Sequence, residues 1–293
     1  MNDKFHMTQD ENIFLARKIL VENIYNTAKL EGVNTTFPET EAILDGVNVP
    51  GAKLDDIQVI LNLRDAWRDI LRDVSTADIN LDYIKRINAS VSRNESLAWG
   101  ELRTGKIGIS GTNHKPGIPD EVKAAELVDT TINNTSKSVT ERAIDIALYV
   151  MHEQLFWDGN KRTASLAANA MLIRGGAGIL SIAPDNIVEF NRLLKHYYDT
   201  HDARELKRFL YSVAIVDFGS RNVPVNVPVN VPVNSTEEAV MNVIRQNPSA
   251  TYDEIADAIG KTRKTVSRAI AALKQKGVLR REGSDKSGSW IIL

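Results

Sequence analysis

The sequence contains no cysteine among its 293 residues. This absence excludes disulfide bridges, thiolate zinc sites and a cysteine nucleophile, and it suits a reducing compartment. The chain also lacks any apolar run close to the ~20 residues that a membrane-spanning helix needs. Its first residues, Met1–His6, include no apolar signal core. We therefore expect a cytoplasmic protein that has no membrane partner.

The composition is that of a globular protein with an uneven charge distribution. Hydrophobic residues make up 43% and charged residues 25%, which is an ordinary balance, and the length suffices for two domains. From Ser235 onward, ten Lys/Arg face seven Asp/Glu, so this tail is about +3 and the rest about −5 out of a net −2. A basic tail on an acidic body indicates an anionic partner for the tail alone.

A proline repeat marks the boundary between the two predicted domains. The tetrad Asn-Val-Pro-Val occurs three times, beginning at Asn222, and proline at every fourth residue excludes a helix and favours a stiff spacer. A docking segment for a partner protein is the alternative interpretation. We predict a helical domain over 1–217 (N-terminal helices about 11–72, core about 80–215), a linker over 218–234 and a second domain over 235–293.

The first domain is predicted to be mainly α. Apolar residues recur at helical spacing over 11–30 and again over 55–72. Thr140 is the predicted cap of another helix. The segment 163–174 is apolar on nearly all sides, so we expect a central buried helix that Gly175 and Gly176 bring to an end.

One segment departs from the helical pattern and alternates like a short strand between glycines. Pro116 and Pro119 follow it. We predict a small β-hairpin flap on the helical body, formed by Gly105, Lys106, Ile107, Gly108 and Ile109.

The tail is predicted to hold helices over about 236–246, 251–259 and 262–276, followed by strands over 278–281 and 289–292. Thr251 and Glu254 form a capping box at the second helix. This order is typical of the winged helix-turn-helix of bacterial regulators. A winged helix used for protein contacts, including a homodimer, is the alternative. Because a helix fits the major groove and cations reach phosphates, we predict that the third helix binds DNA through Arg263, Lys264, Thr265, Ser267 and Arg268.

The segment between two helices of the first domain carries the clearest chemical pattern. Residues 158–160 read as a tight turn that leads into the N-terminus of the buried helix, where free N–H groups and the helix dipole favour anions. Gly159 allows close backbone approach, Lys161 and Arg162 add positive charge, and Asp158 offers a carboxylate for a divalent cation. The pattern predicts a nucleotide-phosphate site; an ordinary helix start with surface charges is the alternative.

The same segment resembles a known family. Phe156 to Ala164, Phe-Trp-Asp-Gly-Asn-Lys-Arg-Thr-Ala, resembles the signature loop of the Fic/Doc (Fido) family, His-x-Phe-x-Asp/Glu-Gly-Asn-Gly/Lys-Arg. The ending Asn-Lys-Arg-Thr-Ala is similar to the Doc branch. The predicted flap resembles the substrate-aligning hairpin of the family. The resemblance extends over about 11–215, and a C-terminal winged helix is a common companion of such domains.

The resemblance implies an activity and a set of roles. Family members typically move AMP (AMPylation), or less often a phosphoryl group, from a nucleotide to a protein hydroxyl. The resemblance therefore implies ATP or another nucleotide with Mg²⁺, and a protein substrate as partner. It assigns the metal carboxylate to Asp158, the anion hole to Gly159 and Asn160, and phosphate contacts to Lys161 and Arg162.

Two departures from the family pattern bear on catalysis. Gln154 stands where the family has its histidine, and an amide cannot accept a proton at neutral pH. His152, two residues upstream, is the remaining candidate base, and the second arginine of many AMP-transferring members is Ser165 here. We therefore expect a nucleotidyl- or phospho-transferase with a DNA-binding tail. The alternatives are a catalytically degenerate Fic domain that acts as a sensor in a DNA-binding transcriptional regulator, and a purely structural interaction protein.

A second motif resembles a regulatory element of the family. The run Thr27 to Gly32, Thr-Ala-Lys-Leu-Glu-Gly, is similar to the inhibitory Ser/Thr-x-x-x-Glu-Gly helix, whose glutamate blocks the site of the nucleotide γ-phosphate. The resemblance implies that Glu31 competes with phosphate for a cation. Because the usual arginine partner is absent, that cation would be Arg162 or Lys161. A plain helix end with a glycine is the alternative.

Overall fold

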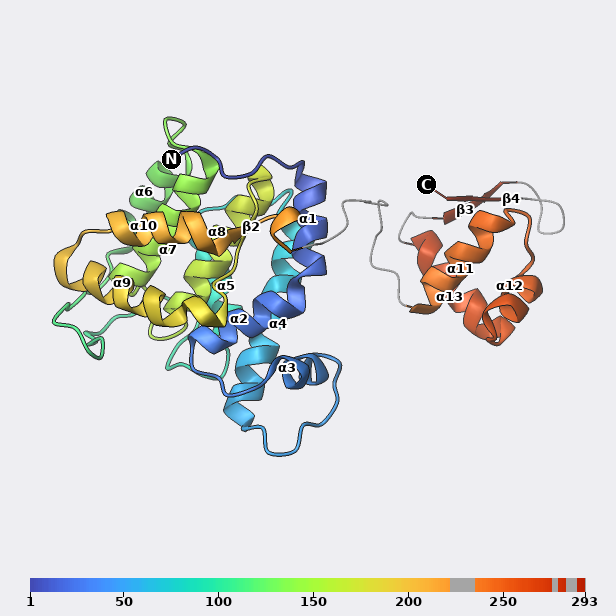
Figure 1. The fold of residues 1–293 in the computed structure, drawn as a ribbon, viewed down its shortest axis with the longest axis horizontal. Coiled ribbons are helices and arrows are strands. Elements are labelled where there is room, and N and C mark those ends of the chain that lie inside the picture. The colour runs from blue at the N-terminus through green and yellow to red at the C-terminus, as the bar shows by residue number, and fades with distance from the viewer. Residues whose placement is uncertain (222–234, 276–278, 283–288, 293) are drawn as a thin grey trace. The chain divides into compact units, whose positions relative to one another are not determined.

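The computed structural model describes residues 1–221, 235–275, 279–282 and 289–292. The chain divides into two compact units, Met1–Val225 and Asn226–Leu293 (Figure 1). The proline repeat at 222–234 lies outside the described residues. The predicted fold class is confirmed, since helices dominate and the strands form two small antiparallel pairs. No helix in the described ranges is long and apolar enough to cross a membrane.

The first unit is built from ten α-helices among its described residues, with a 3-10 turn before α9 and a π turn and a second 3-10 turn after α10. These helices are α1 (Gln9–Lys18), α2 (Leu20–Leu30), α3 (Phe37–Leu44), α4 (Leu54–Asp73), α5 (Leu81–Val91), α6 (Glu121–Ile132), α7 (Val139–Glu153), α8 (Asn160–Gly175), α9 (Ile187–Thr200) and α10 (Arg204–Phe209).

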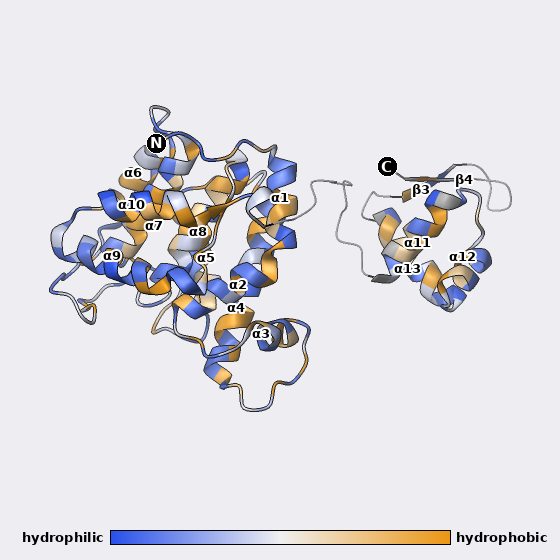
Figure 2. Cartoon of the chain, viewed as in Figure 1, coloured by the Kyte–Doolittle hydropathy of each residue, from blue (hydrophilic) through white to orange (hydrophobic). Residues whose placement is uncertain are grey.

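Helix α8 lies at the centre of this unit, as its apolar sequence predicts. Every residue from Arg162 to Ile173 is buried, and α1, α5 and α7 pack around it (Figure 1). The helix ends at Gly176, which adopts φ +67° in the left-handed region that favours glycine. Figure 2 shows hydrophobic residues on the inner helices and hydrophilic residues along α9. The central helix therefore gives the loop before it a rigid base.

Two predicted helix boundaries are wrong. The single helix expected over 11–30 is two helices that meet at Ile19; the apolar spacing continues through this residue without glycine or proline, so nothing in the sequence marks the break. The cap of α7 is Ser138, whose hydroxyl accepts from Glu141 N at 3.1 Å. Thr140 is instead buried in the first turn, and its N–H donates to Asp3 at 2.8 Å.

The predicted hairpin flap is also corrected. Residues 105–111 form a loop without a strand, and the two-stranded sheet of this unit instead pairs β1 (Ile179–Leu180) with β2 (Ile215–Val216) in antiparallel register. An alternating sequence forms a strand only where a second segment pairs with its backbone. Within the described residues no such segment lies beside 105–111.

The second unit has the order of elements that the sequence predicts. Helices α11 (Ser235–Gln246), α12 (Tyr252–Ile259) and α13 (Arg263–Gln275) precede the antiparallel strands β3 (Leu279–Glu282) and β4 (Ser289–Ile292). The capping box of Thr251 and Glu254 is confirmed. Trp290 is buried in the hydrophobic core of this unit, and its indole N–H donates to the Ala250 carbonyl at 2.8 Å. Residues 276–278 of the predicted third helix and first strand lie outside the described residues.

Candidate functional site

The turn between α7 and α8 has two residues in the left-handed region. Gln154 ends α7 with φ +48°, and Gly159 precedes α8 with φ +71°. A Cβ on Gly159 would lie 2.3 Å from Ser92 Oγ, so any side chain here would collide with the end of α5. Glycine is therefore required by packing inside the protein as well as by its φ angle.

Side chains on both sides hold this turn in one conformation. The Asp158 carbonyl accepts from Asn88 Nδ2 at 3.0 Å and from Ser92 Oγ at 3.1 Å. Asn160 closes the turn from within, because its Oδ1 accepts from Phe156 N at 2.9 Å and its Nδ2 donates to Phe156 O at 2.8 Å. The turn is thus organised before any ligand binds, which lowers the ordering cost of binding.

Arg162 points into the protein body. Its side chain is 3% exposed and lies 2.9 Å from the Glu95 carboxylate, with a further bond to the Val91 carbonyl at 2.6 Å. Burial raises the pKa of Glu95, and the Arg162 charge opposes that shift. Asp158 Oδ2 lies 3.7 Å from the Arg162 guanidinium. We call the segment 154–162 the signature turn. Its part that holds Asp158 and Arg162 therefore faces α5 and Glu95.

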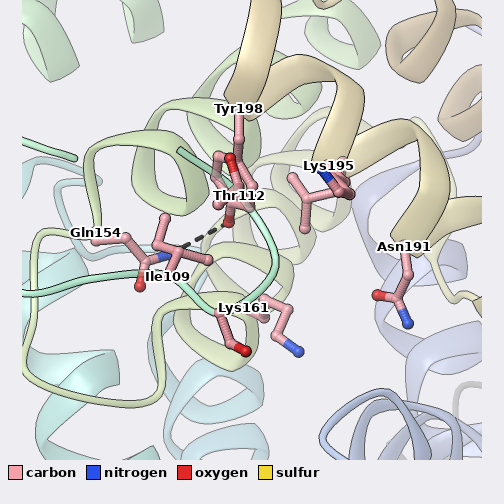
Figure 3. A pocket seen from close by; sticks show the side chains of 9 residues that line it. Ile109, Thr112, Gln154, Lys161, Asn191, Lys195 and Tyr198 are labelled. Carbon is pink, nitrogen blue, oxygen red and sulfur yellow. Dashed lines mark hydrogen bonds between the residues drawn. The ribbon is translucent and has the colours of Figure 1, made fainter. Parts of the chain in front are cut away.

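The other half of the turn faces a cavity of about 360 Å³ between the loop at 105–119, the start of α8 and α9 (Figure 3). Of the residues that the sequence predicts as site residues, Gln154, Lys161 and Ile109 line it, whereas Asp158 and Arg162 do not. The complete lining is Ile109, Ser110, Thr112, Gln154, Lys161, Asn191, Leu194, Lys195 and Tyr198.

The Gln154 amide is fixed at the cavity wall. Its Nε2 donates to the Met151 carbonyl at 2.6 Å, and its Oε1 accepts from Asn160 Nδ2 at 3.3 Å. Nε2 also donates to Tyr198 Oη at 3.3 Å, the contact drawn as a dashed line in Figure 3. Burial raises the pKa of the Tyr198 phenol, so this group stays neutral. Among the described residues that line the cavity there is no histidine and no carboxylate. At neutral pH, the wall therefore lacks a carboxylate or imidazole base.

His152 does not line the cavity. Its ring is buried; Nδ1 lies 2.7 Å from the Glu153 carboxylate and Nε2 lies 3.0 Å from His201 Nδ1. Both ring nitrogens thus have partners within the protein. The side chain at the cavity is Gln154, and His152 belongs to a separate cluster.

The two cations of the cavity are paired with carboxylates. Lys161 Nζ lies 3.4 Å from Glu31 Oε2 and donates to the Leu30 carbonyl at 3.2 Å. Lys195 Nζ lies 2.7 Å from Asp199. Glu31 stands at the end of α2, directly before Gly32, which adopts φ +82°. Of the two cations that the sequence offers to Glu31, the structure brings Lys161 to it.

The other two residues of the motif that resembles an inhibitory helix differ in burial, since Thr27 is buried and Gly32 is exposed. Thr27 is buried, and its hydroxyl lies 3.4 Å from Asn23 Oδ1. A Cβ on Gly32 would meet nothing within 4 Å, so the positive φ angle alone requires glycine here. Thr27 therefore packs within α2, and Glu31 is the residue of the motif that touches the cavity wall.

Arg103 fixes both ends of the loop at 105–119. The buried guanidinium donates to the carbonyls of Gly105 at 2.6 Å and of Gly117, and also to the Gln154 carbonyl at 2.5 Å. Gly105 is packed so closely on Trp157 that a Cβ would lie 2.5 Å from the indole, whereas Gly108 faces open space. Lys106 is exposed and Ile107 is half-buried. The middle of the predicted flap is therefore accessible, and its base is held firmly.

Several residues that shape this site carry no local motif. Asn88 and Ser92 stand one helical turn apart at the end of α5, Glu95 follows them, and Tyr198 lies on α9. Spacing of four residues between two small polar side chains is common on helices. Only the fold brings these residues and Arg103 to the turn, so no pattern in the sequence marks them.

The exposed face of α13 carries the predicted DNA-binding residues. Arg263, Lys264, Ser267 and Arg268 are exposed, and Thr265 is half-buried. Arg263 lies 2.9 Å from Asp253 of α12, in a pair in which both side chains are more than 60% exposed (67% and 63%). A pair so exposed contributes little stability, and so a phosphate can compete with Asp253 for this arginine.

Two family models match the chain in its two units. Residues 78–172 match the Fic/DOC family, and residues 233–280 match the winged helix-turn-helix DNA-binding family. The first match includes α5, the loop at 105–119, α7 and most of α8, and thus the whole signature turn. The second match covers α11, α12 and α13 and reaches the first two residues of β3.

Similar proteins include curated relatives and solved structures. The protein adenylyltransferase fic-1 of Caenorhabditis briggsae is 24% identical over 196 residues, which are 64% of this chain and 38% of that protein. The protein adenylyltransferase Fic of Drosophila melanogaster is 26% identical over 195 residues, 64% of this chain and 39% of that protein. The chain thus spans about two fifths of the length of these relatives.

The structural likenesses concern the fold. A fragment of Fic-1 from Caenorhabditis elegans superposes with a TM-score of 0.59 and 22% identity, covering 67% of this chain and 60% of that one. A Fic family protein from Desulfovibrio desulfuricans gives a TM-score of 0.57 and 18% identity, covering 95% of this chain and 87% of that one. The first unit therefore has the fold of these proteins.

Proposed function

We propose that this chain, which carries a Fic/DOC family domain at residues 78–172 and a winged helix-turn-helix domain at residues 233–280, is a nucleotide-responsive DNA-binding regulator. The Fic-like domain binds a nucleotide polyphosphate, and the winged helix binds DNA. The observation that carries the proposal is the position of Lys161, which stands in the first turn of α8 and lines the cavity.

The start of α8 has the properties of an anion site. No side chain caps this helix, so the first N–H groups of α8 depend on water or a ligand for hydrogen bonds. Lys161 and Lys195 add two positive charges to the cavity wall. A polyphosphate would satisfy the N–H groups and would replace the carboxylates that now pair with both lysines.

Asp158 fits the role of magnesium ligand that the family resemblance assigns to it. Its side chain is 52% exposed, and one oxygen accepts from Gly159 N at 2.6 Å while the other lies 3.7 Å from Arg162. Such a carboxylate has capacity left for a hard cation that also binds phosphate oxygens and water. When bound, Mg²⁺ would supply charge neutralisation for the phosphates.

The chemistry of the cavity favours sensing over transfer. Transfer of AMP to a hydroxyl needs a group that takes the hydroxyl proton. The Gln154 amide, already bonded to Tyr198 and Asn160, cannot take it. A domain that keeps the phosphate-binding charges but lacks the base can bind a nucleotide without consuming it, as a sensor does.

A transferase is the second candidate. Proteins that are 24% and 26% identical to this chain over the matched 196 and 195 residues are protein adenylyltransferases, and the loop at 105–119 lies beside the cavity where a protein substrate would dock. In this case, another base, such as a bound hydroxide or a group of the substrate protein, would accept the proton.

The DNA-binding half of the proposal rests on α13. Its exposed cations follow one face of the third helix of the domain, which is the second helix of the helix-turn-helix and the element that enters the major groove in such domains. Because binding neutralises phosphates and releases counterions, its affinity should fall steeply with salt.

Labelled ATP distinguishes the candidates. We would titrate the full chain with ATP and Mg²⁺ by calorimetry and then incubate it with ATP labelled at the α- or γ-phosphate and a cell extract. Saturable binding without label transfer supports the sensor, and transfer that is lost in Asp158→Ala supports the transferase. Lys161→Ala should weaken binding, whereas Lys123→Ala, an exposed lysine of α6, should not. Absence of any binding would contradict both.

DNA binding needs its own test. Fluorescence anisotropy with a mixed duplex library should show salt-dependent binding that the double variant Arg263→Ala/Arg268→Ala weakens. Arg245→Ala, an exposed arginine of α11, is the matched control. If the double variant binds like the wild-type chain, α13 is not the DNA-reading helix. Repeating the titration with ATP present tests whether the nucleotide alters the affinity for DNA.

A further inference from the structure

Three of the five histidines of the chain meet in one cluster. His114 belongs to the loop at 105–119, His152 to the last turn of α7, and His201 to the end of α9. One ring nitrogen of each lies within 4.8 Å of the others. We propose that this histidine cluster is a transition-metal site, best suited to Zn²⁺, that fastens the loop at 105–119 to α7 and α9.

The ring nitrogens of His152 are already oriented for a metal. Glu153 Oε1 lies 2.7 Å from His152 Nδ1, and because a carboxylate accepts hydrogen bonds, the proton of the neutral ring is on Nδ1. The lone pair of Nε2 then faces His201 Nδ1 at 3.0 Å. A carboxylate bound to the outer nitrogen of a histidine is the usual support of a metal-binding imidazole.

The other two rings can supply their own nitrogens. His114 Nε2 lies 3.0 Å from the His152 carbonyl, which accepts the proton of that nitrogen and leaves the lone pair on Nδ1. His201 Nδ1 donates to His152 without a metal, and moving its proton to Nε2 frees Nδ1 to bind the ion. No net proton is released in this change.

The geometry is close to that of a three-histidine zinc site. Zn–N bonds of about 2.0–2.1 Å place tetrahedral nitrogens about 3.3 Å apart. The His152–His201 pair is already at 3.0 Å. The nitrogen of His114 lies within 4.8 Å of the other two, so metal binding would draw the half-buried His114 ring and the exposed His201 ring closer together. The fourth position is left to water.

The donor set also selects the class of metal. Three imidazoles suit Zn²⁺, Co²⁺, Ni²⁺ or Cu²⁺, whereas Mg²⁺ prefers oxygen ligands. The site is therefore distinct in chemistry from the proposed magnesium site at Asp158.

The cluster is linked to the cavity through two residues. Tyr198 lines the cavity and stacks on His114 with 5.6 Å between ring centroids and 7° between ring planes. Thr112 also lines the cavity, and its hydroxyl accepts from His114 N at 3.1 Å. A metal that holds His114 would thus hold one wall of the cavity in place.

The test uses the full chain without an affinity tag. Bound metal ions are first removed with a chelator, and no nucleotide is added. Titration with ZnCl₂ against a chromophoric competitor should show one ion bound per chain with submicromolar affinity, and Co²⁺ should give the visible absorption of a tetrahedral nitrogen site. His114→Ala and His201→Ala are the test variants, because both rings are accessible and their removal spares the core. Each should weaken binding by at least the roughly 10–100-fold that loss of a supporting outer partner costs.

A histidine outside the cluster serves as the matched control. His196→Ala removes an exposed histidine of the same helix α9 that is outside the cluster and should leave zinc affinity unchanged. Hydrogen exchange should slow over residues 105–119 when Zn²⁺ is added to the wild-type chain and not to His114→Ala. Absence of stoichiometric zinc binding, or equal losses in His196→Ala and His201→Ala, would overturn the proposal whether or not the protein binds ATP.

Discussion

The Lys161 ammonium lies 3.4 Å from the Glu31 carboxylate, and the two side chains are 29% and 20% exposed. This contact joins the end of α2 to the first turn of α8, two elements 130 residues apart in sequence. The one cation that both lines the cavity and belongs to the signature turn is thus occupied by a carboxylate of the same chain. A phosphate bound at the proposed site would compete with Glu31 for the same charge.

The first prediction follows from that competition. Glu31→Ala should tighten ATP binding by about two- to fivefold, because a partly exposed ion pair contributes up to about 1 kcal/mol. Calorimetric titration at low salt measures the change. Glu41→Ala, an exposed carboxylate of α3, is the control and should leave the affinity unchanged. Equal affinities in all three proteins would show that Glu31 does not occupy the phosphate site.

The second prediction concerns the missing base. Gln154→His places an imidazole at the cavity wall, within reach of the groups that now hold the Gln154 amide. If the rest of the site keeps the arrangement of a transferase, this variant should transfer label from α-labelled ATP to protein, and the wild-type chain should not. Gln154→Asn is the matched control. Binding of ATP by Gln154→His without any transfer would mean that more than the base is lost.

The third prediction tests the packing of the signature turn. Gly159→Ala adds a Cβ that would lie 2.3 Å from Ser92 Oγ at φ +71°, so the strain alone should cost about 1–3 kcal/mol. Thermal and urea unfolding of the full chain measure this loss in the transition of the first unit. Gly108→Ala is the control, since its Cβ would meet nothing within 4 Å. A similar effect in both variants would contradict the tight packing against α5.

The fourth prediction tests whether Arg162 stabilises the fold or binds the phosphate of a ligand. Arg162→Ala leaves the carboxylate of Glu95 without its buried partner and should destabilise the first unit by about 3–5 kcal/mol. Arg192→Ala, which breaks an exposed pair with Glu189, should leave the stability of the first unit nearly unchanged. Chemical unfolding checks both. An Arg162→Ala protein of wild-type stability with weak ATP binding would instead make Arg162 a phosphate ligand.

The fold could be predicted where local pattern decides it. The all-round apolar sequence of α8 predicts a central helix, and the glycine after it predicts its end. Thr251 with Glu254 predicts the start of α12. The break at Ile19 and the cap at Ser138 could not be predicted, because the first has no mark in the sequence and the second competes with Thr140 two residues later.

The site could be predicted only in part, for a physical reason. The signature turn is contiguous, so its glycine, its lysine and its missing histidine are visible in the sequence. Which side of the turn each residue faces depends on α5 and α9. Ser92, which caps α5, and Tyr198 of α9 come from distant parts of the chain. The sequence therefore grouped Arg162 with Lys161, and the structure separates them.

The most direct test of the account is a crystal structure of the full chain soaked with ATP and Mg²⁺. The account predicts phosphate oxygens within hydrogen-bonding distance of Lys161 Nζ and of the first N–H groups of α8, with Glu31 displaced from the lysine. A nucleotide bound elsewhere, or a cavity that stays without nucleotide while Lys161 remains paired with Glu31, would contradict it.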